Sequence, residues 1–296
     1  MRPQEKMHRA VLSGLGTGLL LCAVSAALAA TTTQHQERHF TVKDRPVVVL
    51  QNIVNGRIEV KSWKNREIVV NSTFVPENVA IDIEQVGDRI DINASSLGSS
   101  KEAHEVEANF QLMVPEQTEL QLKTQTGLIL VEQVNGDMKL QSVAGDVHLK
   151  EVSGYIIVKT TGGSLVCTLC SGKLEFNSIS GSAQILQPAL SNVNLMTTTG
   201  NILYDGDFIR TGLYTMNSGR GLVEVRFSSS DSFDLNAQTY RGTVDNRAAD
   251  FLKPDTHGKH HADASFSHSL FGTVGQGLAK VELSSYSGTI RILKRD

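Results

Sequence analysis

The sequence has few aromatic residues, no excess of positive charge and no stretch with a convincing helical period. Aromatic residues make up 5% of the 296 residues and apolar residues 40%, so the core must be aliphatic and made of many small layers. The formal net charge of −3 excludes the strongly basic surface on which nucleic-acid binding depends. From Phe40 onward, short runs of alternating apolar residues are broken by Gly, Asn, Asp and Ser, which is typical of strands and turns.

Seven glycines stand nine residues apart in the middle of the chain. Each unit reads Gly-x-apolar-x-apolar-x-x-apolar, and such a regular period indicates an internal structural repeat. Successive units form either an antiparallel meander or a β-solenoid, in which each unit is a strand plus a corner and the coils stack in parallel. The glycines are Gly127, Gly136, Gly145, Gly154, Gly163, Gly172 and Gly181.

The seventh position after each glycine distinguishes these two architectures. In a straight strand the second and fourth positions share one face and the seventh points to the other. The seventh position is nonetheless apolar in most units, as in Val134, Val143 and Ile179, and a bend after the fourth position would turn it inward. We therefore predict an all-β chain that forms a parallel β-solenoid, a β-helix-like stack of nine-residue strand repeats. An antiparallel meander or a β-sandwich is the alternative.

We expect two repeats in each coil, so that residues eighteen apart stack on neighbouring rungs. This register places Val131 beside Leu149 inside the stack. It also leaves several apolar residues on outward positions, so we expect part of the sheet to be covered by the strands of Phe40–Asn93 or by a partner. These outward residues are Leu128, Leu130, Ile157 and Val166.

Residues 1–29 have the layout of a secretory signal peptide, with a basic start, an apolar stretch at Val11–Val24 and a small-residue site at Ala27–Ala29. The alternative is an uncleaved anchor in the cytoplasmic membrane, because residues 10–30 are long enough to span a bilayer. After this segment we expect a flexible polar lead-in at residues 30–39. A single β-strand-repeat domain then covers residues 40–296, with its repeat core at 126–188.

Two groups of residues with reactive or metal-binding side chains remain to be interpreted. Cys167 and Cys170 are the only cysteines left after cleavage, and both occupy inward repeat positions without a helix N-terminus to activate a thiol. We interpret them as small core residues or as a local disulfide. His257, His260 and His261 are the candidates for binding a metal, since imidazole is a common ligand, but we expect a solvated loop.

Catalytic signatures are missing from the sequence. There is no Gly-x-Ser-x-Gly elbow, no phosphate-binding loop and no Gly-Gly-x-Gly-x-Asp calcium repeat. Asp137 and Asp146 both follow a repeat glycine but form no ladder of acids, and Asp205 and Asp207 flank Gly206 as they would in a turn. We therefore predict no catalytic residue, no cofactor-binding residue and no enzyme.

Three segments carry a resemblance to a known family: Asn52–Trp63 followed by Glu67–Val70, the glycine-spaced strands, and Ser287–Ile292. Across roughly residues 40–293 the chain resembles the bacterial putative-adhesin family of β-strand-repeat domains, whose function is unknown. The resemblance implies a Gly-rich, β-solenoid-like domain on the outer side of a cytoplasmic membrane. The family has no agreed catalytic residues, so none is carried over.

We expect an exported, non-catalytic structural or interaction module in the periplasm or at the cell surface. Its expected partner is an envelope protein or a glycan, with no cofactor and with membrane contact only through an uncleaved signal segment. Envelope-stress sensing is an alternative function. A carbohydrate-active enzyme would be favoured if the structure placed a cluster of acids with an arginine in one groove.

The signal-peptide interpretation predicts cleavage after Ala29, because the small-residue site follows the apolar stretch directly. Intact-mass analysis of the protein from the envelope fraction should show a chain that begins at Ala30. A species that still begins at Met1 and spans the membrane would support the anchor instead.

Overall fold

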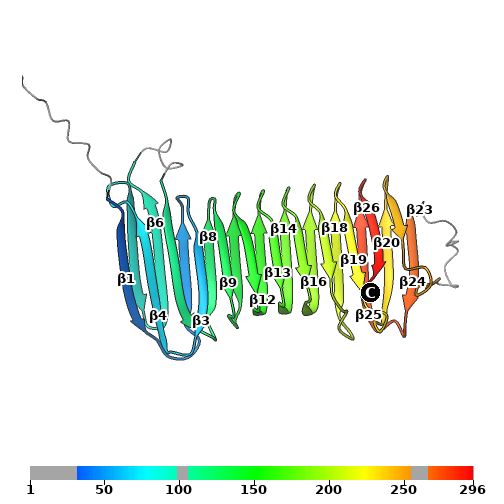
Figure 1. The fold of residues 1–296 in the computed structure, drawn as a ribbon, viewed down its shortest axis with the longest axis horizontal. Helices are drawn as coiled ribbons and strands as arrows, with labels where there is room; N and C mark the ends of the chain where they lie inside the picture. Colours follow the sequence, from blue (N-terminus) through cyan, green and yellow to red (C-terminus); the bar gives the residue numbers. More distant parts are fainter. Residues whose placement is uncertain (1–31, 99–105, 255–265, 296) are drawn as a thin grey trace, which may run out of the picture. The chain divides into compact units, whose positions relative to one another are not determined.

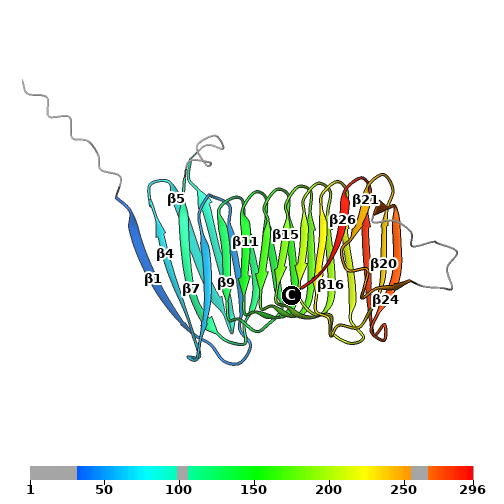
Figure 2. The ribbon, with the colours of Figure 1, turned by 45° about the vertical axis from the view of Figure 1, so that its right-hand side comes forward.

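The structure of the chain is a computed structural model that describes residues 32–98, 106–254 and 266–295. These residues form two sheets of thirteen strands each, which pack face to face around one hydrophobic core (Figures 1 and 2). In spatial order, sheet A holds β1 (Gln34–Thr41), β4 (Glu67–Phe74), β7 (Ala108–Pro115), β3 (Ile58–Trp63), β9 (Leu128–Glu132), β11 (Asp146–Lys150), β13 (Leu165–Thr168), β15 (Ala183–Leu186), β17 (Ile202–Asp205), β19 (Val223–Phe227), β26 (Thr289–Lys294), β21 (Thr243–Asn246) and β23 (Phe266–Ser267). Sheet B holds β5 (Val79–Val86), β6 (Arg89–Ser96), β2 (Val47–Asn52), β8 (Glu119–Thr124), β10 (Met138–Ser142), β12 (Ser153–Thr160), β14 (Ser171–Ser178), β16 (Ala189–Thr197), β18 (Leu213–Ser218), β25 (Ala279–Ser285), β20 (Phe233–Thr239), β24 (Ser269–Val274) and β22 (Lys253–Pro254).

The parallel solenoid is confirmed, and two repeats make one coil. The first repeat of each pair forms a strand of sheet A, and the second forms a strand of sheet B. Val131 pairs with Leu149 in parallel register, and Leu140 pairs with Val158 in the same way in the other sheet. Since neighbouring strands of the repeat core are parallel, the antiparallel meander does not apply there.

A column of glycines runs through the corner at which the chain passes from sheet B to sheet A. A Cβ added to Gly145, Gly163 or Gly181 would lie well under 3.0 Å from the carbonyl oxygen of the glycine one coil before it. Backbone therefore occupies the space that a side chain would need, and only glycine fits. The same column continues beyond the nine-residue repeat through Gly200, Gly221, Gly288 and Gly242.

A serine or threonine stands three residues before these glycines and shapes the same corner. The amide of Gly145 donates a hydrogen bond to Ser142 Oγ at 2.7 Å, and the amide of Gly288 donates to Ser285 Oγ at 2.8 Å. Both hydroxyl-bearing residues are buried, so the bond satisfies polar groups that water does not reach. The recurring Ser/Thr-x-x-Gly motif thus marks one corner of each coil.

The inward seventh position holds for four of the seven repeats. In the repeat core, a non-glycine residue with positive φ follows each sheet A strand and bends the chain, and the seventh position then lies in the core, as in Val134 and Val152. After each sheet B strand, the Ser/Thr-x-x-Gly corner turns the seventh position outward instead. Val143 and Ile179 are therefore exposed, which contradicts the prediction for those units.

The first and last coils of the chain are inserted into the stack. The coil of β2 and β3 lies between β6–β7 and β8–β9, and appears in Figure 1 as blue strands between cyan and green ones. The coil of β25 and β26, drawn in red, lies between β18–β19 and β20–β21 in the same manner. Beyond each inserted coil, antiparallel strands such as β1, β4 and β5 close the sheets. The expectation that the strands of Phe40–Asn93 cover a sheet face is wrong, because they are themselves members of the two sheets.

The glycine column predicts a sharp difference between two adjacent glycines. Gly163→Ala should cost about 3 kcal/mol or more, because its methyl group would overlap the backbone of Gly145. Gly162→Ala is the matched control, since the nearest atom to its added Cβ is Ser180 Oγ at 3.6 Å, and its cost should stay within about 0.5 kcal/mol. Urea unfolding followed by circular dichroism measures both. Equal losses for the two variants would contradict the role of the column.

Candidate functional site

Cys167 and Cys170 are joined by a disulfide in the structure. Cys167 lies on β13, Leu169 between them makes the positive-φ bend, and both cysteines are fully buried in the core. Thiol–disulfide exchange needs access for an attacking thiolate, which this burial denies. The pair therefore forms a local link across one bend of the solenoid.

The predicted metal candidates His257, His260 and His261 lie outside the described residues. Within the described ranges, no group of three or more His, Cys, Asp or Glu residues is placed to hold a metal ion. The two aspartates that follow repeat glycines hold neighbouring coils together: Asp137 accepts from the amide of Tyr155 at 3.0 Å, and Asp146 accepts from that of Ser164 at 2.8 Å.

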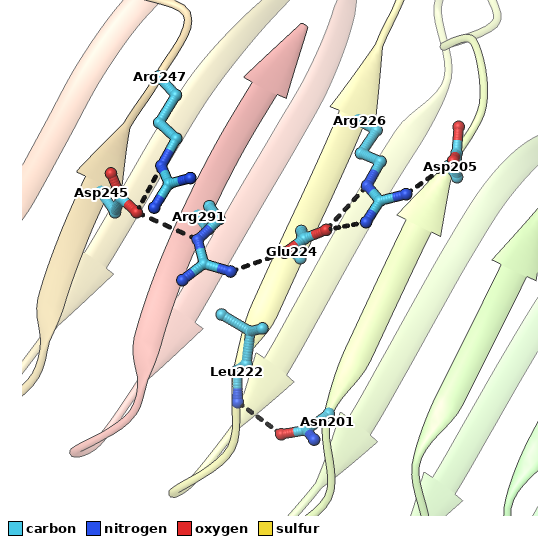
Figure 3. Close-up of polar contacts among 8 residues, drawn as sticks. All are labelled: Asn201, Asp205, Leu222, Glu224, Arg226, Asp245, Arg247 and Arg291. Carbon is cyan, nitrogen blue, oxygen red and sulfur yellow. Dashed lines mark hydrogen bonds and ion pairs between the residues drawn. The ribbon is translucent and has the colours of Figure 1, made fainter. Parts of the chain in front are cut away.

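Acids and arginines gather on the outward face of sheet A near its C-terminal end (Figure 3). Parallel register places Glu224 of β19 opposite Arg291 of β26, and Arg291 opposite Asp245 of β21. Arg291 binds Glu224 and Asp245 at 3.1 Å each. We call the whole set the arginine ladder. It consists of Asp205, Asp207, Glu224, Arg226, Asp245, Arg247, Arg291 and Arg295.

Every carboxylate of the arginine ladder is paired with a guanidinium group. Arg226 Nε lies 2.8 Å from Glu224 Oε1, and Arg247 Nε lies 3.0 Å from Asp245 Oδ2. Hydrogen bonds to Asp245 and Glu224 raise the pKa of Arg291, which keeps it charged. Four acids thus face four arginines, and the ladder carries no net charge.

The buried members of the ladder show that it connects strands and does not form an open site. Glu224 is 7% exposed and Asp245 is 6% exposed, although both point away from the core. The guanidinium groups cover these carboxylates, so a substrate cannot reach them. An acid that protonates a glycosidic bond must meet its substrate directly. Acids and arginines thus gather here, but Glu224 and Asp245 are covered and do not face a groove as the enzyme alternative requires. Arg291 instead links the inserted strand β26 to β19 and β21.

A different surface feature lies where the strands of the N-terminal coils end. The insertion of β2 and β3 forces three connections to run close together at this edge of the stack: residues 42–46, 64–66 and 116–118. They pass the lower left of Figure 1, where the blue strand β1 joins β2. Between them lie two adjoining hollows that share Trp63, Lys64 and Glu116. We call this pair of hollows the Trp63 groove.

The first hollow of the Trp63 groove is predominantly basic. Lys43 and Arg45 come from the connection before β2, and Arg66 joins Lys64 from the connection after β3. Asp44 and Glu116 are the acids in the same hollow, so cations outnumber anions there by two. The Arg66–Asp44 ion pair spans 3.5 Å between side chains that are 76% and 84% exposed. Such an exposed pair contributes little to stability and leaves both groups available to a ligand.

The second hollow is polar, and its lining combines charged residues with neutral ones that can form hydrogen bonds. It is lined by Ser62, Gln133 and Glu151 in addition to the three shared residues. Gln133 and Glu151 are the positive-φ residues of two successive bends, and Gln133 Nε2 donates to Glu151 at 2.9 Å. Positive φ turns each side chain outward at the corner, so the bends that close the coils also supply the hydrogen-bonding groups of this hollow.

Sequence reasoning missed the Trp63 groove, although two signals for it are present. Lys43-Asp44-Arg45 and Lys64-Asn65-Arg66 are both Lys-x-Arg turns, and the second directly follows the single tryptophan. Neither turn is unusual alone. They meet because the single coil of β2 and β3 between them returns the chain to the same corner.

The family model described as Toastrack DUF4097 matches residues 29–293. A search of curated proteins returns no match. Among the described residues, no helix is long and apolar enough to cross a membrane.

Several solved structures align with 88% of the chain. A "putative adhesin" from Bacteroides fragilis aligns over 98% of its own length at 9% identity with a TM-score of 0.47. A "putative cell adhesion protein" from Clostridium sporogenes aligns over 100% of its length at 11% identity with a TM-score of 0.29. A "putative lipid binding protein" from Parabacteroides distasonis aligns over 97% of its length at 9% identity with a TM-score of 0.25. Scores and identities this low carry no argument about what the present chain binds.

The arginine ladder predicts a measurable effect on the last coil. Arg291→Leu should cost about 1–3 kcal/mol, because Glu224 and Asp245 would each lose one of their guanidinium partners while remaining buried. Hydrogen exchange should accelerate in β26 and its neighbours. Arg89→Leu is the control, since Arg89 pairs with Asp91 on an exposed part of β6 and should change neither stability nor exchange measurably. If the two variants behave alike, the ladder does not hold the coil.

Proposed function

The chain belongs to the Toastrack DUF4097 family, and from this premise we propose that it is an exported, non-catalytic interaction module of the cell envelope. The observation that carries the proposal is the Trp63 groove. It is an open surface with basic, aromatic and hydrogen-bonding groups in reach of one another. Pockets of such mixed lining are where proteins bind other molecules.

The distribution of charged residues supports binding in preference to catalysis. The acids of the arginine ladder are neutralised, and Asp137 and Asp146 hold backbone amides. The sulfurs of Cys167 and Cys170 are buried in a disulfide. By contrast, Lys64 and Arg66 lie on a connection at the surface, and Arg66 makes an exposed ion pair with Asp44.

Export to the periplasm or the cell surface is part of this proposal. Residues 1–29 read as a signal peptide, and the family match begins where that segment ends. The Cys167–Cys170 disulfide is consistent with an oxidising compartment, because thiol pools in the cytosol keep such bonds reduced.

Binding to envelopes can be measured by co-sedimentation of the purified protein with isolated envelope fragments. We expect the unchanged protein to sediment with the fragments in a saturable manner. The affinity should be about tenfold lower for the variant Lys64→Glu/Arg66→Glu, because both side chains line the groove. Lys139→Glu/Lys159→Glu is the matched control, since these exposed lysines lie on the outward face of sheet B and the double substitution changes the net charge equally.

Two outcomes would contradict the proposal. Equal sedimentation of the groove variant and the control variant would show that the groove is not the binding surface. Release of reducing ends from the envelope polysaccharides by the purified protein would show that the chain is an enzyme.

A further inference from the structure

We propose that the Trp63 groove binds an anionic oligosaccharide, a chain of sugar rings that carries carboxylate or phosphate groups. This inference rests on the proposed function, because it names the ligand of the same groove. It follows from the way in which the groove combines an aromatic face, a basic hollow and a polar hollow.

Trp63 presents an aromatic surface at the junction of the two hollows. It ends β3 in register with Pro115 of β7, and its indole Nε1 donates to the carbonyl oxygen of Glu67 at 2.7 Å. The N–H group of the ring is therefore hydrogen-bonded within the protein, while the half-buried ring still lines both hollows. An indole face without a free polar group suits the apolar C–H face of a sugar ring.

The basic hollow suits the acidic group of such a ligand. Arg45 has a φ of 54°, and two hydrogen bonds hold the connection around it: Lys43 N donates to Asp88 Oδ1 at 2.8 Å, and Glu119 N donates to the carbonyl of Pro46 at 2.9 Å. A non-glycine residue in the left-handed region costs free energy and persists where its surroundings hold it in place. The backbone at Arg45 is thus held in place beside the hollow that Lys64 and Arg66 also line.

The polar hollow distinguishes a sugar from a simple polyanion. Glu116 and Glu151 would repel a phosphate chain that extended across Trp63 into this hollow. The same carboxylates, together with Gln133, accept and donate hydrogen bonds of the kind that sugar hydroxyl groups make. A ligand that fills the groove must therefore present an acidic group to the basic hollow and sugar hydroxyl groups to the polar hollow, as rings that carry both a carboxylate and hydroxyl groups can.

The protein offers a direct probe of this groove, because Trp63 is its only tryptophan. Intrinsic fluorescence can be recorded while tetragalacturonate is added to the full-length protein. The neutral galactose tetrasaccharide of the same linkage and inorganic polyphosphate serve as comparison ligands. We expect a saturable change in emission with tetragalacturonate and at least about tenfold weaker binding of both comparison ligands.

Calorimetry extends the test to variants that lack the fluorophore. Trp63→Ala and Lys64→Glu/Arg66→Glu should each weaken tetragalacturonate binding by about tenfold, while Lys139→Glu/Lys159→Glu should bind as the unchanged protein does. Higher salt should weaken binding, because the basic hollow holds the carboxylate groups of the ligand by charge. Circular dichroism checks each fold, and if Trp63→Ala does not fold, the surface double variant and Trp63→Phe carry the comparison.

The inference is wrong if tetragalacturonate shows no saturable binding, or if the groove variants and the control variant lose equal affinity. It is also wrong if polyphosphate binds as tightly and Trp63→Ala does not alter either affinity, because charge alone would then explain the binding. Envelope sedimentation that depends on Lys64 and Arg66 without any binding of tetragalacturonate would overturn the sugar ligand and leave the proposed function standing. Loss of groove-dependent sedimentation would overturn the proposed function itself.

Discussion

The contact between one glycine and the carbonyl group of the glycine one coil before it is the constraint on which the stack depends. Strand spacing in a sheet is close to 4.8 Å, and the corner of each coil has no room for a side chain at that spacing. Glycine is therefore needed at every coil, whatever the length of the coil. The additional residues of the longer coils are absorbed elsewhere, in the register shift between β14 and β16 and in the connection between β17 and β18. This is why Gly200 and Gly221 keep their places in the column although the nine-residue period has ended.

The repeat core could be predicted from the sequence because its contacts are periodic. Glycines nine residues apart and apolar residues at fixed positions between them suffice to place Val131 beside Leu149. The alternation of the seventh position was missed because Val134 and Val143 look alike in sequence. Its signal is the Ser/Thr-x-x-Gly motif, which marks only the corner after each sheet B strand of the repeat core. The Trp63 groove was missed for a stronger reason. Its residues come from connections on either side of an inserted coil. No local sequence pattern indicates that β3 pairs with both β7 and β9.

Insertion of the terminal coils explains both surface features of the molecule. At each end a coil lies between two coils to which it is not adjacent in sequence, and this insertion brings distant residues together. At the C-terminal end, Arg291 of the inserted strand β26 lies between Glu224 and Asp245 of its two neighbours. At the N-terminal end, the connections before β2 and after β3 carry Lys43, Arg45, Lys64 and Arg66 to one hollow beside Trp63. One topological feature, used twice, thus produces a closed network in one place and an open groove in the other.

The difference between the two ends follows from where the charges lie relative to the strands. The central residues of the arginine ladder stand on strands in fixed register, so Glu224 and Asp245 meet the guanidinium group of Arg291 between them and are buried. The residues of the Trp63 groove stand on connections, where no register matches each cation to an acid, and two more cations than acids remain in the basic hollow. Charges that are paired within a sheet stabilise the fold, whereas unmatched charges on a rigid edge attract a partner of opposite sign. The end of the solenoid that leaves its charges unmatched is therefore the end at which a ligand is expected to bind.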